Sequence, residues 1–330
     1  MKPFFDVVGV DMPCIDLNLN INTFPQPNGG ARVNQLSWQG GGKVATGMVA
    51  AARQGARCAM LGAAGDDIFG CFCVDDFNRH GIDTESFAVR KGESTSLSVV
   101  LSDRETGGRS FVFRPGSAPR YQMDDFDLRY LRSTRYFFIC SADEDTLTAL
   151  YIARESGARV VVDSDQYSER MMTHIDQLDY FIASEFVYNH LFKDDDYEKN
   201  ARFLLRQGPK AVLFTLGDQG CAGVSEEGYF RLPAYPVDVV DTVGAGDVFH
   251  GAFIAAMLDN CSVKEAALRA SATAAIKCTC IGGRAGIPNR RVLFKFMKTG
   301  TINYGEIDRR IAFYKNLAVD YHMTEVFPHV

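Results

Sequence analysis

A carboxylate follows three small residues in the segment Gly244-Ala245-Gly246-Asp247. Downstream, apolar residues recur at spacings of three and four, which predicts a helix that begins near Asp247 and buries one face. Small residues at such a helix start let an anion approach unpaired backbone N–H groups and the positive end of the helix dipole. A carboxylate there could accept the proton of a hydroxyl that attacks a phosphoryl group. An Asp in a first helical turn is also common without any catalytic role, so these four residues alone leave both interpretations open.

The longer segment from Asp241 to Phe249 favours the catalytic interpretation, because it has the pattern D-T-x-G-A-G-D-x-F. This pattern resembles the C-terminal signature of the ribokinase-like (PfkB) carbohydrate kinases. Other motifs of the family precede this segment in the family's order, so the resemblance covers residue 4 to about residue 290. They are a diglycine before a helix (Gly41-Gly42-Lys43), a G-x-D-x-x-G turn (65–70) and a T-x-G strand end (Thr215-Leu216-Gly217). The resemblance implies an enzyme that transfers the γ-phosphate of ATP to a sugar hydroxyl with Mg²⁺.

The resemblance also implies roles for individual residues. The catalytic group would comprise a base and an anion hole, namely Asp247 with Gly244, Ala245 and Gly246. The sugar would be bound by Asp16, Gly41, Gly42, Lys43 and Arg114. The nucleotide would contact Thr215, Gly217, Thr242 and Gly246. A monovalent cation such as K⁺ would be held by Asp241, Val243 and the carbonyl near Gly282, whereas the motifs identify no Mg²⁺ ligand.

Three positions depart from the family pattern. Thr46 stands where the family has an Asn that contacts the sugar. The N-x-x-E pair associated with magnesium and phosphate falls on Ser184 to Val187, so its Glu is absent unless Glu185 substitutes. Gly286 replaces a side chain that often closes the cation loop, which leaves potassium dependence open.

The substrate class depends on two segments. Residues 111–118, with Arg114, resemble the F-x-R-x-x-S-A segment of fructokinase-like and 2-keto-3-deoxygluconate kinase-like members. Asp165 stands where such kinases often have an Asn, and no arginine follows it. An acid sugar would lose a cationic partner by this change, so we expect a neutral hexose or pentose. The alternatives are a nucleoside kinase of the same family and a catalytically weak sugar-binding sensor, although a pure binder needs no carboxylate in its anion hole.

Short apolar runs rich in β-branched and aromatic residues alternate with helical patterns along most of the chain. Buried strands separated by helices predict a mostly parallel sheet with helices on both faces, that is, a three-layer α/β/α fold. The predicted strands lie near 4–10, 58–64, 136–140, 160–163, 180–183 and 211–216. The predicted helices before Asp247 lie near 43–54, 67–80, 143–156 and 196–207.

Two regions interrupt this alternation. Residues 17–21 alternate with period two, and residues 94–102 and 110–114 flank Glu105-Thr106-Gly107-Gly108 as in a hairpin. We therefore expect a small β-strand lid, with strands at about 15–40 and 94–118, within a single kinase domain of residues 1–330. The tail carries two more helical patterns, which predict a helical extension over 290–330.

Composition limits the partners and the compartment. The net charge of −6 argues against a nucleic-acid partner. The sequence has no run of 18 apolar residues, so we expect no membrane-spanning helix. Nine cysteines, an odd number, and a start that lacks the pattern of a secretory signal predict a reducing cytoplasmic location. A homodimer could form through the lid. We expect the single tryptophan, Trp38, to pack the lid, and His250 to be structural rather than catalytic.

Overall fold

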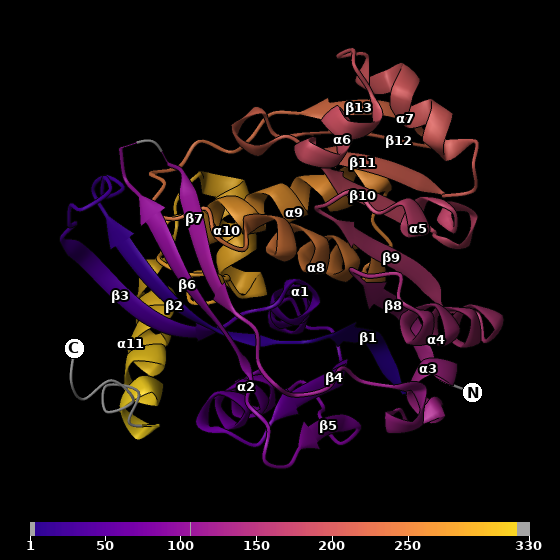
Figure 1. The fold of residues 1–330 in the computed structure, drawn as a ribbon. Coiled ribbons are helices and arrows are strands. Elements are labelled where there is room, and N and C mark those ends of the chain that lie inside the picture. Colours follow the sequence, from indigo (N-terminus) through magenta and orange to yellow (C-terminus); the bar gives the residue numbers. More distant parts are fainter. Residues whose placement is uncertain (1–3, 106, 322–330) are drawn as a thin grey trace.

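Two β-sheets form the framework of the computed structural model, which describes residues 4–105 and 107–321 (Figure 1). The larger sheet has nine strands in the order β13-β12-β11-β10-β9-β8-β1-β4-β5. In chain order these are β1 (Phe5–Asp11), β4 (Cys58–Gly65), β5 (Phe87–Arg90), β8 (Thr134–Ile139), β9 (Arg159–Ser164), β10 (Tyr180–Ser184), β11 (Ala211–Thr215), β12 (Cys221–Ser225) and β13 (Gly228–Leu232). The strands from β11 to β5 are parallel, whereas β12 and β13 add an antiparallel edge.

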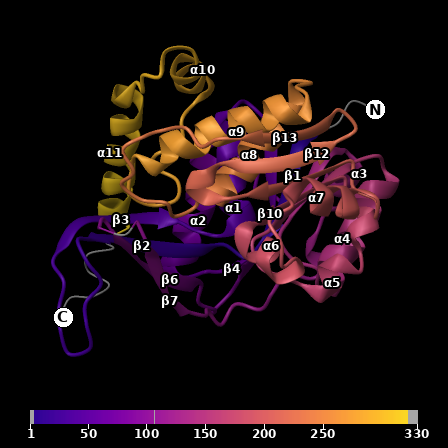
Figure 2. The same ribbon diagram turned by 90° about the horizontal axis from the view of Figure 1, so that it is seen from above.

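Helices cover both faces of this sheet, as the two views show (Figures 1 and 2). Alternate strand residues enter two hydrophobic clusters, so that Val8 packs on one side and Val7 on the other. One side is covered mainly by α3 (Leu128–Arg132), α4 (Glu144–Glu155), α6 (Glu185–Leu191) and α7 (Tyr197–Leu205). The other is covered mainly by α1 (Lys43–Arg53), α8 (Ala245–Leu258) and α9 (Val263–Cys278), with α2 (Ile68–Arg79) beside them. The predicted three-layer α/β/α fold is confirmed.

The smaller sheet stands beside the larger one in the order β3-β2-β6-β7 (Figure 1). Its strands are β2 (Cys14–Ile21), β3 (Val33–Gly40), β6 (Ser96–Asp103) and β7 (Arg109–Arg114), and we call it the lid sheet. Directly paired residues share a face, and Asp16 with its partner Ser98 marks a polar face that includes the buried Asn18 and Asn20. Leu19, Leu36 and Leu101 mark the opposite, apolar face. Of the predicted hairpin turn, Thr106 lies outside the described residues.

Two glycines allow α1 and α8 to pack unusually closely. A Cβ placed on Gly251 would lie 1.8 Å from the carbonyl oxygen of Gly47, and one on Gly47 would lie 2.9 Å from the carbonyl oxygen of Asp247. Side chains at these positions would therefore force the helices apart. This contact brings the first turn of α8 next to the first turn of α1.

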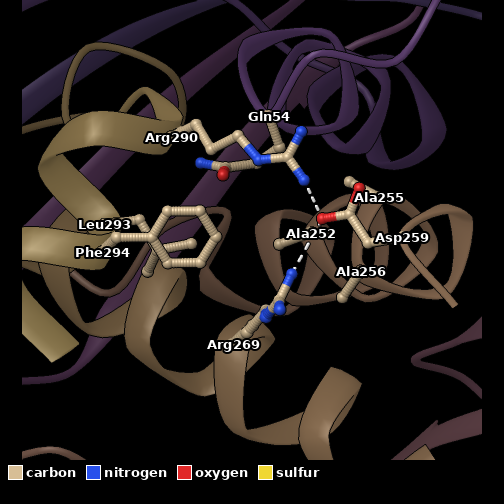
Figure 3. A pocket seen from close by; sticks show the side chains of 9 residues that line it. All are labelled: Gln54, Ala252, Ala255, Ala256, Asp259, Arg269, Arg290, Leu293 and Phe294. Carbon is tan, nitrogen blue, oxygen red and sulfur yellow. Dashed lines mark hydrogen bonds and ion pairs between the residues drawn. The ribbon is translucent and has the colours of Figure 1, made fainter. Parts of the chain in front are cut away.

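The C-terminal part contains α10 (Arg290–Thr299) and α11 (Tyr304–Asp320), and the last residues of the predicted extension, 322–330, lie outside the described residues. A pocket between α8, α9 and α10 contains Asp259 bound to both Arg269 and Arg290 (Figure 3). This pocket lies at the C-terminal end of α8, whereas the anion loop lies at its N-terminal end. Figure 1 shows α11 beside β3, and its Tyr314 and Leu317 share a cluster with Trp38. Within 4–105 and 107–321, no helix is long and apolar enough to cross a bilayer.

Candidate functional site

The anion loop is the start of α8, where Gly244 caps the helix with φ 71° and ψ 7°. Glycine adopts this left-handed conformation without the steric cost that other residues meet. Ala245 uses its N–H in a 3.2 Å bond to the Thr242 carbonyl oxygen. Within the described chain, the N–H groups of Gly246 and Asp247 have no protein acceptor. These two amides are therefore available for an anion. The sequence analysis named Gly244, Ala245 and Gly246 for the anion hole and did not name the Asp247 amide.

Asp247 lies in the first turn of α8, among other ionisable groups. Burial raises the pKa of its carboxyl well above the ordinary value, and the nearby Asp163 raises it further. His250 and Lys43 oppose this rise. A carboxyl with a raised pKa binds a proton more readily than an ordinary one, which suits a general base.

Asp163 and His250 lie behind Asp247 and are both buried. His250 Nδ1 is 2.7 Å from the Gly246 carbonyl oxygen and 3.3 Å from Asp163 Oδ2, and burial lowers the imidazole pKa. Burial and the Asp165 carboxylate raise the pKa of Asp163 to about 8. His250 thus holds the backbone of the anion loop, which supports its predicted structural role. The sequence analysis placed Asp163 only at the end of a predicted strand, because no local pattern indicated its contact with His250.

Lys43 begins α1, and its Nζ forms an ion pair with Asp165 after β9. The Asp that replaces the family's Asn therefore meets the lysine predicted to contact the sugar. These residues are 122 positions apart, so the pairing could not be read from spacing. Lys43 and Asp165 lie with Asp163 at the carboxyl ends of the parallel strands, which is where α/β sheets usually bind ligands.

Asp16 and the diglycine are in direct contact. A Cβ on Gly41 would lie 2.4 Å from Asp16 Oδ1, and Gly42 has φ 97° just before α1. Burial raises the pKa of Asp16 to about 6, while the Cys14 thiol and Arg284 act in the opposite direction. The structure thus brings together Asp16, Gly41, Gly42 and Lys43, as the sequence analysis expected for one sugar site.

A buried arginine fixes the diglycine from behind. Arg284 pairs with Asp76 of α2 at 2.5 Å, both side chains being fully buried, and donates to the Gly41 carbonyl oxygen at 2.8 Å. It also lies 3.4 Å from the hydroxyl of Thr46, the residue that departs from the family's Asn. Gln39 of β3 accepts N–H bonds from Arg284 and Ala285. Sequence reasoning missed Arg284, whose partners lie more than 200 residues away.

The remaining predicted residues lie along neighbouring strand ends and loops. Thr215 ends β11, and Gly217, with φ 56°, follows it at the same sheet edge. Thr242 precedes the anion loop and accepts a 3.1 Å hydrogen bond from Arg109 of the lid sheet, a contact that the sequence did not suggest. Arg114 ends β7 as an exposed residue paired with Leu97 through the backbone, and the described chain offers its guanidinium no hydrogen-bond or ion-pair partner. Trp38 is buried and stacks on Phe69 at 6.1 Å, so it packs the lid as expected.

The Asp241 carboxylate joins the three residues predicted to hold a monovalent cation, because it binds the backbone of both Val243 and Gly282. Asp241 Oδ1 accepts the Val243 N–H and Oδ2 accepts the Gly282 N–H, each at 2.9 Å. The Asp241 carbonyl oxygen accepts a 2.8 Å hydrogen bond from Lys277 Nζ. Lys277 was not singled out in the sequence, although a lysine within the Ala-rich pattern of α9 is a signal that could have been noticed.

Comparisons with known proteins agree with this arrangement. A probable fructokinase of Arabidopsis thaliana is 30% identical over 288 residues, which cover 78% of this chain and 82% of that protein. A 5-dehydro-2-deoxygluconokinase of Clostridium perfringens is 27% identical and covers 94% of this chain and 97% of its own.

Solved structures of ribokinases have a similar fold. A putative ribokinase II from E. coli, in complex with ATP and Mg²⁺, matches with a TM-score of 0.78 at 21% identity, over 90% of this chain and 99% of its own. Ribokinase from Thermotoga maritima matches with a TM-score of 0.75 at 26% identity, over 90% of this chain and all of its own. Residues 4–290 match the pfkB family of carbohydrate kinases. As its motifs and fold both indicated, the chain belongs to the pfkB carbohydrate kinase family.

Proposed function

We propose that this ATP-dependent sugar kinase phosphorylates a hydroxyl of a neutral hexose or pentose, with Asp247 as the general base. The observation that carries the proposal is the carboxylate of Asp247 beside two open backbone amides at the start of α8. The nucleoside kinase and the sugar-binding sensor are not favoured, because the named relatives above are sugar and sugar-acid kinases and Asp247 is present.

The proposed reaction uses the chain's own groups in a simple order. Asp16 and the diglycine orient the sugar, and Asp247 takes the proton from its hydroxyl as the oxygen attacks the γ-phosphorus of ATP. The bond between the γ-phosphorus and the bridging oxygen breaks, so the products are sugar phosphate and ADP. The amides of Gly246 and Asp247 hold the negative charge that is carried by the transferring group.

The nucleotide would enter with Mg²⁺ as one substrate. Within the described part of the chain, no group of three or more His, Cys, Asp or Glu side chains is placed to hold a metal ion. This agrees with an ion held mainly by phosphate oxygens and water, as Mg²⁺ commonly is in phosphoryl transfer. We propose that Thr215, Gly217, Thr242 and Gly246 contact the nucleotide.

The preference for a neutral sugar rests on the charges around the site. Asp163 and Asp165 lie near Asp247, and the lysine beside them, Lys43, is already paired with Asp165. A sugar carboxylate would meet these like charges, and the ammonium of Lys43 could bind it only by giving up Asp165. A coupled assay of ATP against neutral sugars, sugar acids and nucleosides tests the proposed function; a marked preference for a sugar acid would contradict it.

Arg114 remains the proposed lid residue for sugar recognition. Hydrogen bonds to charged groups contribute about 1.5 to 3 kcal/mol, against roughly 0.5 to 1.5 kcal/mol for neutral pairs. Arg114→Met is therefore expected to lower kcat/KM for fructose or ribose by about threefold to tenfold, and for 2-keto-3-deoxygluconate by more. The control is Arg32→Met, an exposed arginine of the same lid region. Unchanged values on every substrate would show that Arg114 is only a surface residue.

We also propose that two copies of the chain associate through the lid sheet. Leu36 and Val112 are 57% and 63% exposed on its apolar face, where Leu19, Val99 and Leu101 lie beside them. Exposed apolar patches of this kind commonly mark protein interfaces.

A charge at Val112, on the edge strand β7 of this patch, provides the test, because an unpaired charge is costly to bury. The parent is expected to migrate as a dimer in light-scattering chromatography, and Val112→Glu to weaken the dimer at least tenfold. Val89→Glu, at an exposed strand residue outside the lid sheet, is the control. A monomeric parent would contradict the proposal.

The proposed compartment is a reducing cytoplasm, as the odd cysteine count suggested.

A further inference from the structure

Lys277, near the end of α9, is completely buried, with no exposed surface. Lysine is rarely buried, because an ammonium loses its hydration there unless polar atoms replace the water. Its Nζ donates to the carbonyl oxygen of Asp241. The positive charge therefore lies directly beside the turn that leads into Gly244 and the open amides of α8.

This turn is held on several sides by α9 and the loop after it. The N–H groups of Val240 and Asp241 both donate to the Cys278 carbonyl oxygen, at 2.8 and 3.1 Å. The Asp241 carboxylate accepts the N–H groups of Val243 and Gly282. Moving Lys277 would thus disturb the backbone that shapes the anion loop.

The residues do not fit a free monovalent cation in addition to this ammonium. Both carboxylate oxygens of Asp241 already accept backbone N–H groups, and its carbonyl oxygen already binds Lys277. A K⁺ ion at that carbonyl would place a second positive charge next to the first. Gly286 has no side chain that could contribute a ligand, and a Cβ there would lie only 2.5 Å from the Lys277 carbonyl oxygen.

We propose that the ammonium of Lys277 takes the place of a monovalent cation beside the anion loop, so that the kinase needs no K⁺. An alkylammonium group carries the same charge as K⁺ and is of similar size, and here it is attached to the chain. The inference builds on the proposed function, because it assigns the loop beside Lys277 to phosphoryl transfer.

The first test compares cations. Enzyme freed of monovalent metal ions is assayed in K⁺, Na⁺ or tetramethylammonium chloride at equal ionic strength. The parent is expected to show kcat values within twofold of one another. Activation of the parent by K⁺ of fivefold or more would overturn the inference, because a separate cation site would then exist.

The second test removes the ammonium. Lys277→Ala is expected to lose at least tenfold in kcat in tetramethylammonium, and K⁺ or methylammonium is expected to restore part of it. Lys264→Ala, an exposed lysine on the same helix, is the matched control. A Lys277→Ala enzyme with full activity in tetramethylammonium would overturn the inference.

Thermal unfolding supplies a measurement that does not depend on catalysis. K⁺ is expected to raise the Tm of Lys277→Ala, relative to tetramethylammonium, and to leave the parent's Tm unchanged. Lys277→Met, which fills more of the vacated space, serves if the alanine variant does not fold. A Tm of the variant that ignores K⁺ overturns the inference, whereas an inactive parent would instead count against the proposed function.

Discussion

Asp247→Asn is expected to lower kcat by about 10²- to 10⁴-fold while the affinity for ATP and the Tm change little, because the loss of a general base typically has this effect. The amide has the size of the carboxylate but cannot accept the hydroxyl proton. The first turn of α8 keeps its conformation, since Gly244 and the Gly47–Gly251 contact determine it. The measurement is steady-state kinetics with the preferred sugar, together with direct titration of the nucleotide.

Asp124→Asn, which changes an exposed carboxylate, is the control and should leave kcat unchanged. The pH profile gives a second measurement. Since burial and Asp163 raise the pKa of Asp247, kcat/KM of the parent should fall with decreasing pH well above the ordinary Asp value, as the base becomes protonated. If Asp247→Asn keeps more than about a tenth of the parent's kcat, the loss is below roughly 1.4 kcal/mol and Asp247 is not the base.

The sequence predicted the fold where strong local patterns coincide with buried elements. The apolar segments predicted as strands near 4–10 and 58–64 form β1 and β4. Strands in a sheet covered on both faces are apolar along their whole length, which makes them easy to recognise in a sequence. The antiparallel strands β12 and β13 were not predicted. Small residues such as Ala222 and Gly223 carry little β-propensity, and pairing with β11 rather than their own pattern places them.

The residues of the candidate site likewise fall into those that a local motif indicates and those that only distant contacts define. Residues within motifs, such as Asp247 and Gly41, could be proposed from the sequence, because the backbone conformation around them is set by neighbours in sequence. Lys277 and Arg284 could not, because their partners come from distant segments that meet only in the folded chain. The pairing of Lys43 with the distant Asp165 could not be predicted either, and it occupies the ammonium that the motif predicts to contact the sugar.

Gly41 shows how a motif residue and a distant contact combine, and it provides the second large expected effect. Gly41 is not among the glycines with positive φ, so alanine is compatible with its backbone. The new Cβ would nevertheless lie 2.4 to 2.5 Å from three atoms of the Asp16 carboxylate, which must move. Hydrogen bonds from a sugar to a charged group contribute about 1.5 to 3 kcal/mol, so Gly41→Ala is expected to raise the sugar KM by about 10- to 100-fold.

The KM for ATP should change much less, because Asp16 and Gly41 lie on the sugar side of the proposed site. Water can replace a poorly held sugar as the phosphoryl acceptor, so the variant should also hydrolyse a larger fraction of the ATP it consumes. Gly30→Ala is the matched control: it lies between β2 and β3 of the same lid sheet, and a Cβ there meets no atom within 4 Å. A Gly41→Ala enzyme with the parent's sugar KM and the parent's ratio of sugar phosphate to ADP would show that the Asp16 carboxylate does not hold the sugar.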